Sequence, residues 1–198
     1  EVGLDVINDG EFGKSISWSR YVLERLDGFV QRTGKGEVGM PKGVVGKDHR
    51  DFPEFYAEYD KAQGFTGMSG WAVTGPIRYA GHAALQHDIE LFKAGAAGVD
   101  ATDLFFPAVA PASVAPDRDD EVYTSDDEYV FAVADALHEE YKAIVDAGLI
   151  LQVDDAYLAS YDEVMVPPGT MADFRKWAEV RVEALNHALR GLPQDRVR

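Results

Sequence analysis

Short apolar runs that stop at glycine or at polar residues alternate along this chain with longer segments of helical period. Such runs are typical of strands, and helical segments between them favour parallel pairing of those strands. The predicted strands cover residues 4–7, 70–74, 103–109 and 149–153. The pattern therefore predicts an α/β fold in which helices connect parallel strands.

Apolar residues recur at helical spacing in the segments between these strands. One helix is predicted from Trp18 to a stop at Gly28, and a second one after Pro53. A third is predicted from His82 to Gly95, because its apolar residues fall on one side of a helix.

Two further helices begin with a capping box, in which the first side chain and one three residues later satisfy each other's backbone amides. Ser125 with Glu128 forms one box, and Thr170 with Asp173 forms the other. Glycine is common directly after a helix, and here it closes these two helices at residues 148 and 191.

The composition fits one globular domain. The chain has 198 residues, 46% of them hydrophobic, so it can bury a sizeable core. Its 35 acidic residues against 19 lysines and arginines give a net charge of −16, which would repel a phosphate backbone. Nucleic acid is therefore excluded as a partner. The absence of cysteine excludes disulfides, thiolate nucleophiles and sulfur metal ligands from this chain.

The sequence also bears on the cellular location of the protein. No apolar run approaches the roughly 20 residues that span a bilayer. The chain does not open with the basic and apolar segments of a secretory signal. We therefore expect no membrane partner and a cytoplasmic location.

Two motifs that often carry chemistry lack the context they need. Residues 34–39 match the G-x-G-x-x-G pattern of dinucleotide sites, but no apolar strand precedes them, and residues 33–47 are predicted to form a loop. His82 and His87 are five positions apart, which does not place both rings on one helix face as a metal pair requires. The other histidines, at positions 49, 138 and 187, are predicted to lie on the surface.

Acidic residues at strand ends are the stronger signal, because the loops at the carboxyl ends of barrel strands build active sites. Such loops are Asp9-Gly10-Glu11, Thr74-Gly75-Pro76 and Asp154-Asp155. The alternatives are purely structural roles, namely a tight turn at Asp9-Gly10 and a helix cap at Asp154. Since neighbouring strand residues point to opposite sides, only one of Asp154 and Asp155 should face the barrel axis, with Gln152 on the side of Asp154.

Four stretches together are similar to a known family. They are residues 5–11 with 19–21, residues 74–77, residues 110–114, and residues 139–141 with 151–155. They resemble the C-terminal catalytic domain of cobalamin-independent methionine synthases and relatives that move alkyl groups to thiols, such as epoxyalkane:coenzyme M transferase. The resemblance implies a TIM-like (β/α)8 barrel.

A closed barrel of this kind needs about 200 to more than 400 residues, and this chain has 198. The chain opens on Glu1, and Arg196-Val197-Arg198 follow the last helix as though another strand were beginning. We therefore expect residues 1–198 to form the central part of one barrel domain, truncated at both ends.

The resemblance implies a zinc-dependent methyl or alkyl transferase, with a small-molecule thiol as acceptor and a methyl or alkyl donor. Homocysteine methylation and alkyl transfer of the coenzyme M type are both open. By position, Glu11 and Asp154 match the family's two acidic residues that hold the amino acid acceptor. The family's His-x-Cys zinc motif has no counterpart here, so zinc ligands would lie outside this chain and the 198 residues alone would be inactive.

One departure from the family bears on the acceptor. Methionine synthases carry Glu-Pro after the matched aspartate, whereas this chain has Asp155-Ala156-Tyr157, which favours the alkyl-thiol branch. One alternative is a metal-free barrel enzyme like uroporphyrinogen decarboxylase, for which Arg20 and Arg78 are the candidate carboxylate ligands. The other is a non-catalytic barrel that binds a small molecule.

Overall fold

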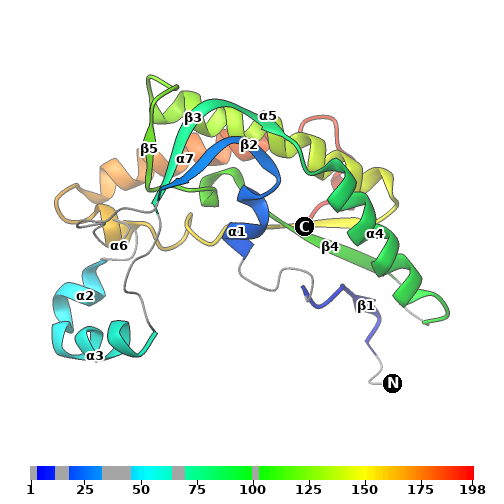
Figure 1. Cartoon of the computed structure of the whole chain (residues 1–198), viewed down its shortest axis with the longest axis horizontal. Coiled ribbons are helices and arrows are strands. Elements are labelled where there is room, and N and C mark those ends of the chain that lie inside the picture. Colours follow the sequence, from blue (N-terminus) through cyan, green and yellow to red (C-terminus); the bar gives the residue numbers. More distant parts are fainter. Residues whose placement is uncertain (1–3, 12–17, 33–45, 64–69, 100–102) are drawn as a thin grey trace.

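The computed structural model describes residues 4–11, 18–32, 46–63, 70–99 and 103–198. Its strands form two three-stranded sheets, with helices packed against them (Figure 1). The first sheet has the order β1-β4-β6 and contains β1 (Val6–Ile7), β4 (Asp103–Val109) and β6 (Ile150–Asp154). The second has the order β2-β3-β5 and contains β2 (Leu26–Arg32), β3 (Gly70–Tyr79) and β5 (Arg118–Asp120).

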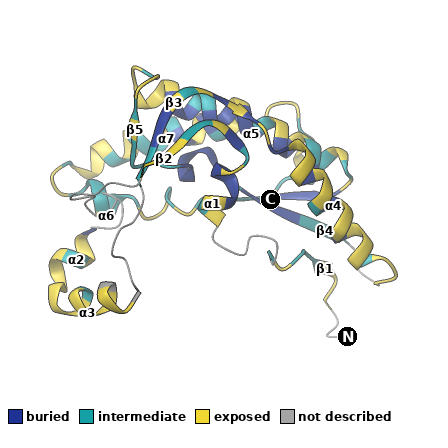
Figure 2. Cartoon of the chain, in the orientation of Figure 1, coloured by how far each residue is buried: buried dark blue, intermediate teal, exposed yellow. Residues whose placement is uncertain are grey.

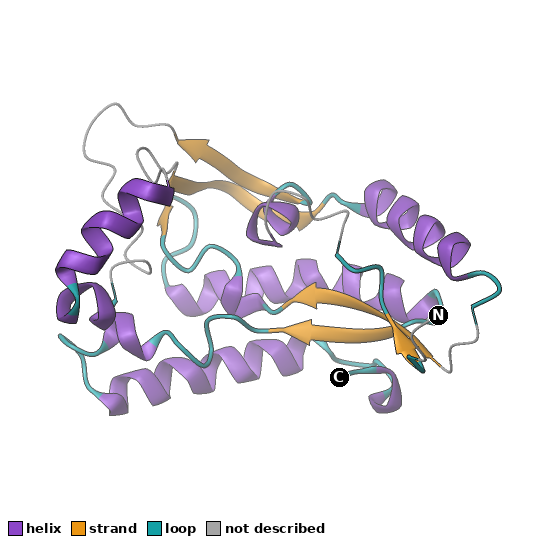
Figure 3. Cartoon of the chain, turned by 90° about the horizontal axis from the view of Figure 1, so that it is seen from below, coloured by secondary structure: helices purple, strands orange, loops and turns teal. Residues whose placement is uncertain are grey.

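The first sheet confirms three of the predicted strands and their parallel pairing. Both β1 and β6 pair in parallel with β4, with Ile7 opposite Leu104 and Phe106 opposite Leu151. Figure 3 shows the two long arrows of this sheet side by side and pointing the same way. Val197 forms a parallel bridge to Leu151, so the segment predicted to begin another strand does pair with β6.

The second sheet corrects two predictions. Helix α1 (Trp18–Leu23) ends well before Gly28, because Leu26 already belongs to β2. The strand expected to stop at residue 74 continues to Tyr79, and it pairs antiparallel with β2 and parallel with β5 instead of joining the first sheet.

A large bulge explains how β3 runs through a proline. Asp27 pairs with Arg78 and Phe29 with Val73, so Gly28 alone lies opposite the segment Thr74–Ile77. Proline has no amide to donate, and a bulge is where a strand tolerates it. Gly28 adopts φ +95°, and a Cβ at this position would lie 2.7 Å from the Gly75 carbonyl oxygen. Only glycine fits this close approach.

The remaining helices largely agree with the sequence pattern. They are α2 (Lys47–Asp51), α3 (Pro53–Gln63), α4 (His82–Ala96), α5 (Asp126–Asp146), α6 (Asp162–Met165) and α7 (Met171–Ala188). The capping box predicted at Thr170 and Asp173 is confirmed. Only half of the box predicted at Ser125 forms: Ser125 accepts a hydrogen bond from the Glu128 amide, whereas the Glu128 side chain accepts one from the Thr124 amide. The short helices α2 and α6 were not predicted.

Helix α5 carries the centre of the core. Its buried side chains include Val133, Leu137, Tyr141 and Ile144, each with 0% exposure, and they pack against both sheets and α7. Figure 2 shows this inner face as buried, whereas α2, α3 and the outer side of α4 are exposed. Within the described ranges the strands do not close into a barrel; the chain forms a partial α/β arrangement.

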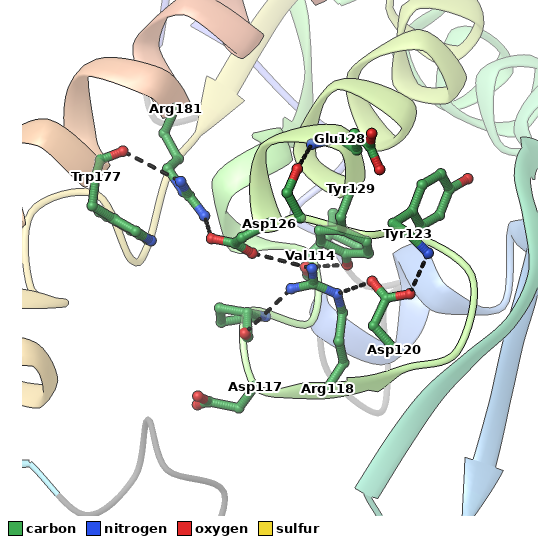
Figure 4. Close-up of polar contacts among 12 residues, drawn as sticks. Val114, Asp117, Arg118, Asp120, Tyr123, Asp126, Glu128, Tyr129, Trp177 and Arg181 are labelled. Carbon is green, nitrogen blue, oxygen red and sulfur yellow. Dashed lines mark hydrogen bonds and ion pairs between the residues drawn. The ribbon is translucent and has the colours of Figure 1, made fainter.

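A charge network joins the start of α5 to β5 and α7 (Figure 4). Asp126 forms ion pairs with both Arg118, at 3.1 Å, and Arg181. The side chains of Arg118 and Arg181 are only 7% and 6% exposed. Arg118 also pairs with Asp120 and lies 3.1 Å above the ring centroid of Tyr129. Two nearly buried guanidinium groups therefore share one carboxylate.

The G-x-G-x-x-G motif at 34–39 lies outside the described residues. Among the helices that the structure describes, none is long and apolar enough to cross a bilayer.

The bulge predicts opposite effects for two glycines. Gly28→Ala should lower the free energy of unfolding by about 2–4 kcal/mol, because Cβ would press on backbone atoms in a strained conformation. Gly95→Ala is the matched control, since its Cβ would meet open space on α4, and it should raise stability by about 0.5–1 kcal/mol. Urea denaturation of both variants checks this. Equal effects would contradict the bulge.

The charge network predicts that Asp126→Ala lowers the free energy of unfolding by about 1–3 kcal/mol, because the substitution leaves the buried Arg181 without its carboxylate. Asp127→Ala removes the neighbouring exposed acid from the same first turn of α5. This control should change stability by about 0.5 kcal/mol or less. Chemical denaturation compares the two, and an equal loss would show that only the helix dipole is involved.

Candidate functional site

A cavity of about 110 Å³ lies where the three parallel strands of the first sheet end. Its lining residues come from four places: Glu11 after β1, Trp18 and Tyr21 in α1, Ala108 and Val109 at the end of β4, and Asp154 and Ala156 at and after the end of β6. In parallel sheets the carboxyl ends of adjacent strands are the usual place for a binding site. The two site residues predicted from the sequence, Glu11 and Asp154, therefore line the same cavity.

The turn after β1 sets the position of Glu11. The Asn8 side chain accepts a hydrogen bond from the Gly10 amide, and the Asp9 side chain accepts one from the Glu11 amide, each at 3.0 Å. Gly10 and Glu11 both have positive φ, at 70° and 54°. A left-handed conformation is uncommon for glutamate and is often found at functional sites. Asp9 and Gly10 thus form the tight turn of the structural alternative, and this turn also places Glu11 at the cavity.

The end of β6 separates its two aspartates. Gln152 donates a hydrogen bond to Asp154 at 3.0 Å, so these side chains lie on the same side, as strand alternation predicts. Asp154 lines the cavity and is exposed. Asp155 instead accepts hydrogen bonds from the Ser113 hydroxyl at 2.8 Å and from the Leu158 amide at 3.1 Å.

Asp155 and Ser113 together anchor the loop after β6. The Ser113 side chain is 1% exposed, and its oxygen also accepts a hydrogen bond from the Tyr157 amide at 3.2 Å. Ser113 lies in a short 3-10 helix that follows β4 directly. The loops after β4 and β6 are thus fixed to each other, and Asp154 remains available to the cavity.

Tyr21 forms one wall of the cavity and belongs to a buried polar group. The guanidinium of Arg25 lies 3.5 Å from the Tyr21 ring centroid and is paired with Asp88 at 2.5 Å. Burial, and next the negative charge of Glu140, raise the pKa of Tyr21. Burial and Glu140 act on Tyr79 in the same way and raise its pKa. Both tyrosines therefore stay protonated at neutral pH, and the wall is neutral.

The charge of the cavity follows from its lining. Among the described lining residues there are two carboxylates, on Glu11 and Asp154, and no basic side chain. Trp18 adds an aromatic surface, and Ala108, Val109 and Ala156 are small or apolar. Such a site suits a small molecule with a cationic group, because the two carboxylates attract a positive charge placed near them.

Several residues of this region were not predicted as site residues. Trp18 and Tyr21 were assigned to a helix, and their approach to β4 and β6 is not encoded in local spacing. Glu140 is 1% exposed on α5. One signal was present, since Glu140 is a carboxylate beside Leu137 and Tyr141 in the apolar face of the helix.

Other candidates from the sequence lie elsewhere. The segment Thr74–Ile77 forms the bulge of the second sheet. Arg20 is paired with Glu24 on α1 at 2.7 Å, and Arg78 is exposed on β3. The described lining of the cavity contains neither arginine.

The histidines behave as surface or helix-packing residues. His82 lies 3.2 Å from Glu139 and His187 lies 2.8 Å from Asp135, both as carboxylate contacts. The His138 ring lies 2.8 Å from the Ala188 carbonyl oxygen. His49 contributes to a second cavity, described below.

The described residues do not fit a catalytic zinc site. Among them, no group of three or more His, Cys, Asp or Glu side chains could hold a metal ion. The sequence also contains no cysteine. The prediction that zinc ligands lie outside this chain remains a prediction.

The comparisons with known proteins concern the fold. No protein-family model matches the sequence, and no curated protein matches it significantly. A solved structure does: that of a B12-independent methionine synthase from Shewanella sp. W3-18-1 in complex with selenomethionine, with a TM-score of 0.56 and 18% sequence identity. The match covers 96% of this chain but 44% of that one, so this chain spans less than half of its length. At this identity the likeness shows a shared fold.

Substitutions of the two aspartates at the end of β6, Asp154 and Asp155, should differ in their effect on stability. Asp155→Ala should lower the free energy of unfolding by about 1–2 kcal/mol, because it leaves the buried Ser113 hydroxyl and the Leu158 amide without their acceptor. Asp154→Ala should change stability by less than about 0.5 kcal/mol, since its side chain is exposed. Urea denaturation decides, and a larger loss for Asp154→Ala would reverse the assignment.

Proposed function

We propose that this chain is the acceptor-binding part of a methyl or alkyl transferase that acts on a thiol, with Glu11 and Asp154 holding the ammonium group of an amino acid acceptor. One observation carries the proposal: acids that follow two different parallel strands line one small cavity. The fold shared with a methionine synthase supports it, as does the selenomethionine held by that protein.

Electrostatics favour a cationic group over an anionic one. An ammonium ion between the two carboxylates would gain charge-assisted hydrogen bonds. A ligand whose only charged group is a sulfonate or a carboxylate would meet like charge, and the described lining has no basic side chain to offset it. The cavity therefore favours an amino acid such as homocysteine over a sulfonate thiol of the coenzyme M type, against the preference drawn from Asp155-Ala156-Tyr157. The same argument disfavours the polycarboxylate substrates of a decarboxylase.

The contribution of this chain would be orientation. The two carboxylates at the ends of β1 and β6 would fix the amino end of the acceptor, and a fixed acceptor presents its sulfur in one direction. The neutral Tyr21 wall and the apolar end of β4 would contact the acceptor's carbon chain. The zinc ion that the family resemblance implies lowers the pKa of a bound thiol, and its ligands would come from outside these 198 residues.

Calorimetric titration of the 198-residue chain with L-homocysteine, under reducing conditions, tests the binding step. We expect saturable binding that Glu11→Gln and Asp154→Asn each weaken about tenfold, since each removes one charged partner of the ammonium group. Glu179→Gln, an exposed acid on α7, should have no effect.

4-Mercaptobutyrate, which lacks the ammonium group, serves as the ligand control. It should not bind at concentrations at which homocysteine saturates. If it bound equally well, or if both acid variants kept full affinity, the proposed roles would be wrong. Thiol alkylation by the protein that contains this chain then separates a transferase from a barrel that only binds.

A further inference from the structure

A second cavity, of about 150 Å³, lies at the far end of the loop after β6. Helices α2 and α3 form one side of it, and the loop with α6 forms the other. Figure 1 shows α2 and α3 below α6, away from the sheets. Gly46, directly before α2, is buried, and a Cβ there would lie 3.4 Å from Cβ of Glu163. The two sides are thus in close contact next to the cavity.

Aromatic rings form the walls of this cavity. On one side His49 and Tyr56 are stacked, with centroids 3.6 Å apart and planes 20° apart. On the other side Tyr157 and Tyr161 are nearly perpendicular, at 88°, with centroids 5.9 Å apart. Four aromatic side chains from the two sides therefore line one small cavity, and the π-systems of aromatic rings attract cations.

Tyr161 is held firmly in its place. It stacks on Trp177 of α7 with centroids 4.8 Å apart, and its hydroxyl donates a hydrogen bond to Asp117 at 2.9 Å. Asp117 precedes Arg118 of the charge network shown in Figure 4. This wall is consequently fixed to the core before any ligand binds, which lowers the entropic cost of binding.

The polar lining is acidic. Asp48 and Glu163 both line the cavity and are exposed, whereas the described lining contains no lysine or arginine. Arg50, which lies outside that lining, donates a hydrogen bond to the Glu163 backbone carbonyl at 3.4 Å.

From these observations we propose that the cavity between α2, α3 and α6 binds a methylated ammonium group. Aromatic faces attract a cation whose charge is spread over methyl groups, and such a cation loses little hydration when it is enclosed. Asp48 and Glu163 at the rim add charge of the right sign. This site does not depend on the function proposed for the first cavity, although Trp18 and Tyr157 are in ring contact between the two, with centroids 6.0 Å apart.

Choline and its neutral carbon isostere, 3,3-dimethyl-1-butanol, form the test pair. Calorimetric titration of the chain should show saturable millimolar binding of choline and at least about tenfold weaker binding of the isostere. Tyr56→Leu should weaken choline binding about three- to tenfold by removing one ring. Tyr59→Leu, an exposed tyrosine on the same helix and outside the described lining, is the matched control and should have no effect.

Glu163→Gln provides a variant on an exposed side chain, with little risk to folding. It should weaken choline binding about twofold or more and leave the isostere unchanged. Equal affinity for the two ligands would overturn the proposal, as would an absence of saturable choline binding or unchanged binding in both Tyr56→Leu and Glu163→Gln. Homocysteine binding in the first cavity should be unaffected by these variants, so the two proposals can fail separately.

Discussion

The parallel placement of β4 between β1 and β6 brings the loops that follow these three strands to the same end of the sheet. Glu11 and Asp154, which are 143 positions apart in the chain, reach the same cavity because of this pairing. The register of β4 with β6, in which Val109 lies opposite Asp154, sets the level at which the acid leaves the sheet. A slip by one residue would turn Asp154 toward the opposite face and Asp155 toward the cavity.

Hydrogen bonds at the strand ends prevent such a slip. The Ala110 amide donates to the Asp154 carbonyl at 2.9 Å, which extends the ladder past the end of the strands. The hydroxyl of Tyr141, on α5, donates to the Val109 carbonyl at 2.6 Å. Because Tyr141 is fully buried in the core, the packing of α5 and the geometry of the cavity are coupled. The Ser113 and Asp155 contacts then fix the path of the loop that leads to the second cavity.

The sequence predicted those features of the fold that are determined by residues close together in the chain. Apolar runs located β1, β4 and β6, and the capping residues Ser125 and Thr170 located the starts of the long helices. Strand alternation assigned Asp154 and Gln152 to one side, and the family resemblance pointed to Glu11. In the second sheet the first half of β3 was predicted, but β2 was not, because β2 follows a helix after two residues and contains Gly28, which resembles a helix stop. The aromatic cavity escaped it because its walls come from segments about 100 residues apart.

The backbone of Glu11 has a consequence for how this position can change. With φ at 54°, a glutamate carries strain that glycine would not have, so loss of the acid by a change to glycine would relieve the turn. At this position folding stability would then favour glycine, whereas ligand binding would favour glutamate. Selection for folding stability alone would favour Glu11→Gly. A glutamate that is kept at this position in related sequences would therefore indicate selection for binding.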